Sequence, residues 1–218
     1  MAVPNARVLT GPSTRTPKVV PRLRRAVPWS PVTSDVRPHE TKSMSDAPVD
    51  IAQHDPGWRE QFLRERQLVH GALSHWLVGL PEHIGSTAVP GLMAKPIIDI
   101  MAPVLSLEAA APAIESAKTI GYAFFPYMPD VMHWFCKPSP EIRTHHLHLV
   151  PVGSRLWNER LAFRDALRAS AELRAQYAAL KTALAVQHRQ DREAYTQGKN
   201  SFIATVLREV LGNDGNAA

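Results

Sequence analysis

Apolar residues recur at three- and four-residue spacing between positions 58 and 77, and this spacing predicts an amphipathic helix. Asp55 is suited to cap the start of this helix, with Pro56 at its first helical position. A second helix is predicted over residues 106–120, with Ser106 as its cap and Gly121 as its stop. These two segments supply the helices of the first half of the patterned chain.

Short β-branched or alternating runs lie between and after these helices. A short apolar strand is predicted before the turn residues IGSTAVPG at 84–91, and the run KPIIDIMAPV at 95–104 is typical of a buried strand. Two further strands are predicted over 122–127 and 131–137. The segment RTHHLHLV at 143–150 alternates with the period of a strand. The middle of the chain is therefore rich in strands.

After Gly153 the pattern becomes helical almost to the end of the chain. Ser170 is suited to cap one of these helices, and a final helix is predicted to stop at Gly212. A flexible loop, QDREAYTQGKNS at 190–201, is predicted before that last helix. The order of a helix, a strand-rich middle and a helical C-terminal part predicts an α+β fold.

Residues 1–43 differ in composition from the rest of the chain. They hold eight of the 25 Lys and Arg residues, two of the 20 Asp and Glu residues, and seven of the 19 prolines. The prolines interrupt every window in which a helix could start, so the segment is predicted to be a disordered basic extension. An unused upstream translation start is the alternative, because Met44 opens a natural polar N-terminus. Residues 44–218 are predicted to form one domain.

Composition and charge exclude several classes of protein. No run approaches the roughly 18 consecutive apolar residues of a membrane-spanning helix. The single cysteine, Cys136, excludes an internal disulfide framework and a zinc site built from several cysteines, and it is interpreted as a buried small residue. Residues 44–218 carry 17 basic and 18 acidic residues, which does not favour nucleic-acid binding. We therefore predict a cytoplasmic protein that binds neither nucleic acid nor membrane.

A glycine- and hydroxyl-rich turn is the first candidate site. Gly85, Ser86 and Thr87 offer successive backbone N–H groups and two hydroxyls, a combination that can bind phosphate groups. Asp99 follows inside an apolar strand, where a carboxylate is costly unless it is paired or holds a cation. Lys95, just before that strand, can meet phosphate charge. The spacing leaves open a structural alternative, a tight turn with Asp99 paired to an arginine.

Three histidines in the strand predicted at 143–150 are the second candidate. Because side chains alternate along a strand, His146 and His148 share one face and His145 points to the other. Two imidazoles on one face can bind a metal, polarise a phosphate or relay a proton. The neighbouring Arg143 favours an anion site, and a hydrogen-bonded core histidine is the alternative.

The C-terminal helices carry charges at four-residue spacing, and most of these charges are expected to form a solvated face with weak ion pairs. This applies to the polar set that includes Arg168, Tyr177 and Lys181. Arg164 and Lys199 are retained as candidate anion contacts, Lys199 because of the flexible loop predicted before the last helix. No Ser-His-Asp order, Walker loop or dinucleotide fingerprint is present.

Six motifs occur in order along the patterned part of the chain: DPGW, EHIGSTAVPGLMAKPIIDI, RTHHLHLV, WNERLAFRDALR, YAALKTALA and AYTQGKNSFIATVL. Together they resemble the GrpB family from about Asp55 to Leu211, and the resemblance does not extend to residues 1–43. It implies the nucleotidyltransferase superfold, a mixed β-sheet flanked by helices, here with a helical C-terminal part. Members of the family are also found fused to dephospho-CoA kinase or acetyltransferase-type domains.

The resemblance also implies where an active site would lie. The superfold places a Gly-Ser turn before a strand with two acids separated by one residue, and a third acid on a later strand. The turn at 85–86 and the first acid, Asp99, match this pattern, whereas Met101 stands at the second acid position. His146 or His148 stands where the third acid is expected. One carboxylate can hold a single Mg²⁺, and its combination with imidazoles favours Mn²⁺ or Zn²⁺.

Three hypotheses follow. The first is a nucleotidyltransferase-fold enzyme that binds a nucleoside triphosphate at residues 85–87 and Mg²⁺ or Mn²⁺ at Asp99 and His148, with His146 and His148 orienting the transferred group toward a small-molecule acceptor. The second is a non-catalytic module for a nucleotide or phosphorylated metabolite. The third is a metal-dependent hydrolase built on Asp99, His146 and His148.

Overall fold

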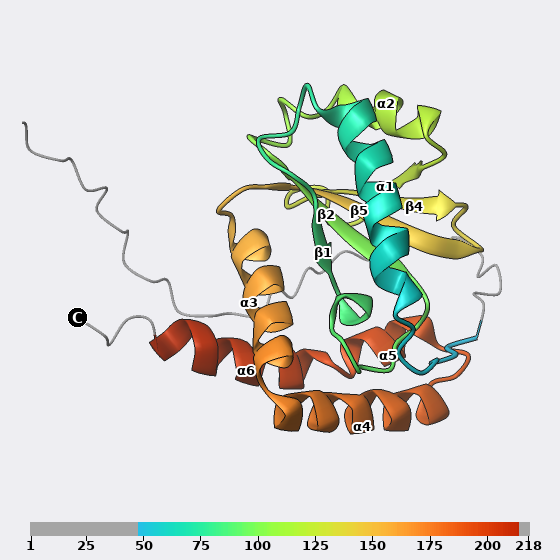
Figure 1. Ribbon diagram of the computed structural model, residues 1–218, viewed down its shortest axis with the longest axis vertical. Coiled ribbons are helices and arrows are strands. Elements are labelled where there is room, and N and C mark those ends of the chain that lie inside the picture. Colours follow the sequence, from blue (N-terminus) through green and yellow to red (C-terminus); the bar gives the residue numbers. More distant parts are fainter. Residues whose placement is uncertain (1–47, 214–218) are drawn as a thin grey trace, which may run out of the picture. The chain divides into compact units, whose positions relative to one another are not determined.

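The computed structural model describes residues 48–213, in which a five-stranded mixed sheet is flanked by helices, as predicted (Figure 1). The predictions for residues 1–43 lie outside the described residues. The strand order is β1-β2-β5-β4-β3; β2 and β5 are parallel and every other pair is antiparallel. The strands are β1 (Glu82–Ile84), β2 (Ile98–Val104), β3 (Ala123–Phe125), β4 (His133–Pro138) and β5 (Arg143–Pro151).

The two faces of the sheet are covered by different helices. One face packs against α1 (Gly57–Leu73) and α2 (Ala113–Thr119), and its core includes Ile98, Ile100 and Leu147. The opposite face packs against α3 (Arg155–Ala169). This division follows from the alternation of side chains along β2 and β5, so Asp99 and Met101 lie on the α3 side.

Helix α1 begins one residue later than predicted, at Gly57, with Pro56 rather than Asp55 at the N-cap position. The Asp55 carboxylate accepts a hydrogen bond of 2.8 Å from the Gly57 backbone N–H, which satisfies one of the amides at the start of the helix. Trp58, Phe62 and Val69 of the periodic apolar set are buried, whereas Leu68 is exposed. The apolar pattern continues beyond the end of the helix to Leu77, which instead forms a bridge with Val104 of β2.

The start of the second helix differs from the prediction. The helix predicted over 106–120 is shortened to α2, which begins only after Pro112, the residue at the N-cap position. Ser106 caps a turn instead, since its hydroxyl accepts a hydrogen bond of 3.1 Å from the Ala109 N–H. Gly121, with a φ of 88°, ends the segment as predicted.

The C-terminal region contains more helix than predicted. Within the stretch predicted as a flexible loop, α5 (Arg192–Gln197) forms, and the Asp191 side chain caps it by accepting from the Ala194 N–H. The predicted stop at Gly212 is wrong, because α6 (Asn200–Asn213) includes that residue. Residues 190–201 were predicted as loop because the segment is polar and contains Gly198. No helix in the described part of the chain is long and apolar enough to cross a bilayer.

The C-terminal helices pack on α3 through aromatic contacts. The Ser170 hydroxyl caps α4 (Ala171–Gln187), as predicted, by accepting from the Leu173 N–H. Tyr177 of α4 stacks on Phe202 of α6 with ring centroids 5.3 Å apart. Phe163 of α3 contacts the Tyr177 ring edge-on, with ring centroids 5.2 Å apart. These rings join three helices into one layer.

Lys181 of α4 is buried rather than part of a solvated face, with 2% of its surface exposed. Its ammonium donates a hydrogen bond to the Met93 carbonyl and lies 5.1 Å from the centre of the Tyr177 ring. Burial, assisted by the charge of Lys199, lowers the pKa of Lys181 to about 7.

This burial predicts a pH-dependent stability. Between about pH 7 and pH 10.5 the unfolded chain binds a proton at Lys181 that the folded chain does not, so the free energy of unfolding should rise by up to about 1.4 kcal/mol per pH unit. Lys181→Met should remove this contribution, and the stability difference between variant and wild type should change across that range. Urea denaturation from pH 7 to pH 9.5 measures it, with the exposed Lys118→Met as the matched control. Parallel stability curves for Lys181→Met and wild type would contradict the expectation.

Candidate metal and phosphate site

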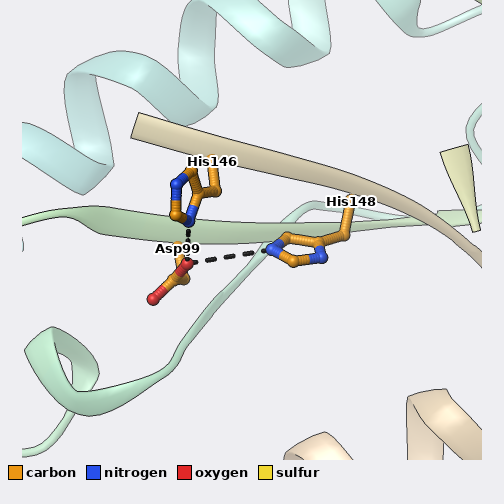
Figure 2. Close-up of side chains that lie close together, drawn as sticks. All are labelled: Asp99, His146 and His148. Atoms are coloured by element: carbon orange, nitrogen blue, oxygen red, sulfur yellow. Dashed lines mark hydrogen bonds and ion pairs between the residues drawn. The ribbon is translucent and has the colours of Figure 1, made fainter. Parts of the chain in front are cut away.

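Asp99 of β2 and His146 and His148 of β5 come together on the α3 side of the sheet (Figure 2). We call these three residues the triad. Because β2 and β5 pair in parallel, Asp99 stands opposite His146, and His148 stands opposite Met101. One possible ligand atom from each side chain lies within 4.8 Å of the other two. The predicted shared face of His146 and His148 is therefore confirmed.

The contacts within the triad are unequal. His146 Nδ1 lies 2.9 Å from Asp99 Oδ1, a hydrogen-bond distance, whereas His148 Nε2 lies 3.8 Å from the same oxygen. The second distance is too long for a hydrogen bond. The Nε2 atoms of both histidines are buried and have no hydrogen-bond partner among residues 48–213. Buried nitrogens without a partner are costly, and a cation bound beside Asp99 would satisfy His148 Nε2. His146 faces Asp99 with Nδ1, and its Nε2 points away from the carboxylate (Figure 2).

The electrostatics of the triad keep the carboxylate ionised. Burial favours the protonated acid, but the interactions with His146 and His148 outweigh it and hold the pKa of Asp99 well below its usual range. Burial also lowers the pKa of His148, against the opposing effect of Asp99. Metal binding needs an ionised carboxylate and neutral imidazoles, and this environment favours those forms for Asp99 and His148.

The turn at 85–88 lies directly against the triad. Gly85 has a φ of 72° and precedes a short 3₁₀ helix, η1 (Ser86–Ala88). A Cβ atom added to Gly85 would lie 2.3 Å from Asp99 Oδ2, so the backbone approaches the carboxylate as closely as only glycine permits. The Ser86 side chain interacts with Tyr177. Thr87, by contrast, uses its hydroxyl within the fold, 3.1 Å from both His83 Nε2 and the Ile97 carbonyl.

Cationic side chains reach this region from the C-terminal helices. Lys199, just before α6, has its ammonium 4.1 Å from the centre of the Tyr195 ring. Burial lowers the pKa of Lys199 to about 8; the charge of Asp99 opposes that shift, and the charges of Arg160 and Arg192 add to it. Asp99 and these cations therefore act on one another electrostatically.

Arg143 lies at the other end of the same face. Its guanidinium carbon is 5.4 Å from the centre of the Trp134 ring, and its Nε donates to the Pro140 carbonyl at 2.6 Å. The Trp134 ring in turn lies 5.0 Å from the His146 ring. The structure thus places Arg143 one aromatic ring away from the triad.

Two further predicted anion contacts lie elsewhere. Arg164 donates hydrogen bonds to Glu82 and Asp165 at 2.8 Å and to the His83 carbonyl at 3.1 Å, and these contacts hold α3 against β1. Anion binding would have to displace these partners. Lys95 is half-buried in the loop before β2, and its role stays a prediction.

Sequence reasoning missed Trp134 and Arg160. Trp134 stands opposite His148 in the β4–β5 register, on the triad side of the sheet. Its two-residue alternation with Cys136 marks a common face, but only strand pairing shows that this face is shared with the histidines. Arg160 carries no local signal that separates it from a solvated helix charge.

The fold and the site together define an α+β protein with a mixed five-stranded sheet and a His-His-Asp cluster beside a Gly-Ser turn. The model of the family described as GrpB protein matches residues 48–209. The chain belongs to the GrpB family.

Relatives and a solved structure agree with this assignment. A UPF0157 protein of Deinococcus radiodurans is 40% identical, over 73% of this chain and 81% of its own length. A UPF0157 protein of Pseudomonas aeruginosa is 36% identical, over 76% of this chain and 69% of its own length. The crystal structure of the conserved protein GrpB from Enterococcus faecalis superposes with a TM-score of 0.69 at 31% identity, covering 77% of this chain and all of that one. A dephospho-CoA kinase of Mycolicibacterium paratuberculosis is 27% identical over 77% of this chain and 47% of its own length.

Proposed function

We propose that this protein binds a divalent cation at the triad and, through the cation, the phosphate groups of a nucleoside triphosphate. In this proposal the protein transfers a nucleotidyl or phosphoryl group to a small-molecule acceptor. The observation that carries the proposal is that His146 Nδ1 and His148 Nε2 both face the ionised Asp99 carboxylate, with one ligand atom of each residue within 4.8 Å of the other two.

The donor set bears on the choice of cation. Mg²⁺ prefers oxygen ligands, whereas a carboxylate with two imidazoles suits Mn²⁺ or Zn²⁺. Met101 is fully buried and stands where the superfold would offer a second acid. Its paired residue on the neighbouring strand β5 is His148. We therefore take Mn²⁺ as the first probe and Mg²⁺ as the second. Three protein ligands leave open positions for phosphate oxygens.

The surroundings of the triad support a phosphate ligand. Gly85 brings the backbone of the turn next to Asp99, and Ser86 adds a hydroxyl at the same place. Lys199, just before α6, adds positive charge within electrostatic reach of Asp99. A phosphate chain on the cation would thus meet a polar turn and an ammonium group. Similarity to part of a protein named dephospho-CoA kinase agrees with a phosphorylated substrate.

The test is calorimetric titration of the full chain with Mn²⁺ and with Mg²⁺, followed by ATP, GTP, CTP and UTP in the presence of each cation. We expect one cation per chain and nucleotide binding that requires the cation. Absence of cation binding by the folded protein would overturn the proposal. Cation-dependent binding with no turnover over a wide panel of acceptors would favour the non-catalytic module.

A metal-dependent hydrolase is the second candidate, because two imidazoles and a carboxylate are also the ligands of catalytic zinc sites with an open water position. The two candidates differ in their need for an acceptor. A hydrolase should release phosphate or pyrophosphate from the nucleotide with water alone. A transferase should release pyrophosphate, in nucleotidyl transfer, or the nucleoside diphosphate, in phosphoryl transfer, at a rate that rises with the acceptor concentration.

A further inference from the structure

We propose that Phe125, Tyr127 and Met128 form a binding surface for the planar base of the nucleotide, next to the phosphate site at the triad. We call these three residues the aromatic shelf. The inference rests on the proposed function, because it places the base at a fixed distance from phosphates held by the triad. It adds a substrate class, since it requires a ligand with an aromatic ring system.

The shelf is exposed to an extent that is unusual for such side chains. Phe125 and Tyr127 are each 50% exposed and Met128 is 42% exposed. Among the large apolar side chains exposed within residues 48–213, Phe125 and Tyr127 are the two aromatic ones, and they lie two positions apart. Single exposed apolar side chains need no explanation, but adjacent exposed aromatic rings indicate a binding surface.

A path of aromatic rings joins the shelf to the triad. Phe125 of β3 stands opposite Trp134 of β4, with ring centroids 6.1 Å apart, and Tyr127 lies 6.2 Å from the same ring. Trp134 lies 5.0 Å from His146. A single ring therefore separates the shelf from the triad, a separation that an extended nucleotide spans between its base and its outer phosphates.

The backbone of the shelf is also tied to the triad. Met128 has a φ of 50°, which is rare for a residue with a side chain, and its carbonyl accepts from the N–H groups of Val131 and Met132. The Met132 sulfur then lies 3.3 Å from His148 Nδ1. This closed turn holds Met128 and Tyr127 in place relative to the triad.

Charge identifies the occupant. The Arg143 guanidinium lies over the Trp134 ring, which contacts both the shelf and His146, and Lys199 and the proposed cation add positive charge at the triad end. The site thus has an apolar aromatic end and a cationic end. A nucleotide has the matching pair of groups, a planar base and a polyanionic phosphate chain. A purely apolar ligand would leave the cationic end without a partner.

The test compares ATP with inorganic tripolyphosphate, each titrated calorimetrically into the full chain in the presence of Mn²⁺. Stacking on an aromatic side chain contributes about 1–3 kcal/mol per base, so Phe125→Ala and Tyr127→Ala should each weaken ATP binding by about 5-fold to 150-fold. Both variants should bind tripolyphosphate and Mn²⁺ as the wild type does. Phe125→Tyr should retain ATP binding, and the exposed Leu105→Ala is the matched control for loss of a surface apolar group.

The outcomes separate this inference from the proposed function. Equal affinity of the wild type for ATP and tripolyphosphate would overturn the shelf and leave the phosphate site standing. Failure of Mn²⁺ or tripolyphosphate to bind would overturn the proposed function itself. If Phe125→Ala changed the sedimentation coefficient but not ATP binding, the shelf would be a contact between copies of the chain, which would also overturn the inference.

Discussion

Asp99→Asn should weaken Mn²⁺ binding by at least about 100-fold and abolish metal-dependent nucleotide binding. Loss of a group that merely orients a ligand costs 10–100-fold in metal affinity, and Asp99 is the triad's one carboxylate. The asparagine side chain keeps the shape of aspartate and can still accept the hydrogen bond from His146 Nδ1, so the fold should persist. Calorimetric titration with Mn²⁺ measures the effect, and circular dichroism checks the fold.

Asp50→Asn is the matched control for this change. Asp50 is an exposed carboxylate that pairs with Arg189 on the surface, so its loss removes the same formal charge far from the triad's chemistry. Its Mn²⁺ affinity should equal that of the wild type. An Asp99→Asn protein that bound Mn²⁺ and nucleotide normally would remove Asp99 from the site.

Gly85→Ala should cost at least about 3 kcal/mol of the free energy of unfolding and displace the Asp99 carboxylate. Two penalties combine at this position. An alanine is strained at a φ of 72°, and its Cβ would lie 2.3 Å from Asp99 Oδ2 and 3.1 Å from Asp99 Cβ. Because the aspartate is short and arises from a central strand, it has little freedom to move away. Urea denaturation and Mn²⁺ titration measure the two effects.

Gly91→Ala separates strain from contact. Gly91 has a φ of 77°, close to that of Gly85, but an added Cβ there would meet nothing within 4 Å. This control should therefore lose only the strain component, about 1–2 kcal/mol, and should bind Mn²⁺ as the wild type does. Equal losses of stability in the two variants, with equal Mn²⁺ affinity, would show that the contact with Asp99 carries no cost.

Local pattern predicted the parts of the site but not their assembly. The alternation in RTHHLHLV was sufficient to place His146 and His148 on one face, and the cost of a carboxylate in an apolar strand was sufficient to single out Asp99. Their contact spans 47 positions and depends on the parallel register of β2 and β5. A pattern within one strand carries no information about that register, and the resemblance to a known superfold supplied the expectation.

The sequence did not predict side-chain environments that are set by contacts between different elements. Lys181 has the four-residue spacing of a solvated charge, yet the Met93 carbonyl and the Tyr177 ring enclose it. The anion contact of Arg164 stays a prediction, and its ion pair with Glu82, distant in sequence, was not foreseen. The alternation of Trp134 with Cys136 marks a common face, but only the pairing of β4 with β5 shows that the histidines share it. In each case the partner comes from another element, which local spacing does not specify.

The position of β3 at the edge of the sheet has a consequence for how a ligand would be held. Asp99 and the two histidines arise from β2 and β5, two of the three strands that have neighbours on both sides, whereas Phe125 belongs to a three-residue edge strand. Local opening begins in short, exposed segments and reaches central strands last, so amide hydrogens of β2 and β5 should exchange far more slowly than those of β3. One end of the ligand would therefore rest on a rigid support and the other on a segment that opens and closes. Such an arrangement lets the base end of a bound nucleotide detach and rebind while its phosphate end stays held.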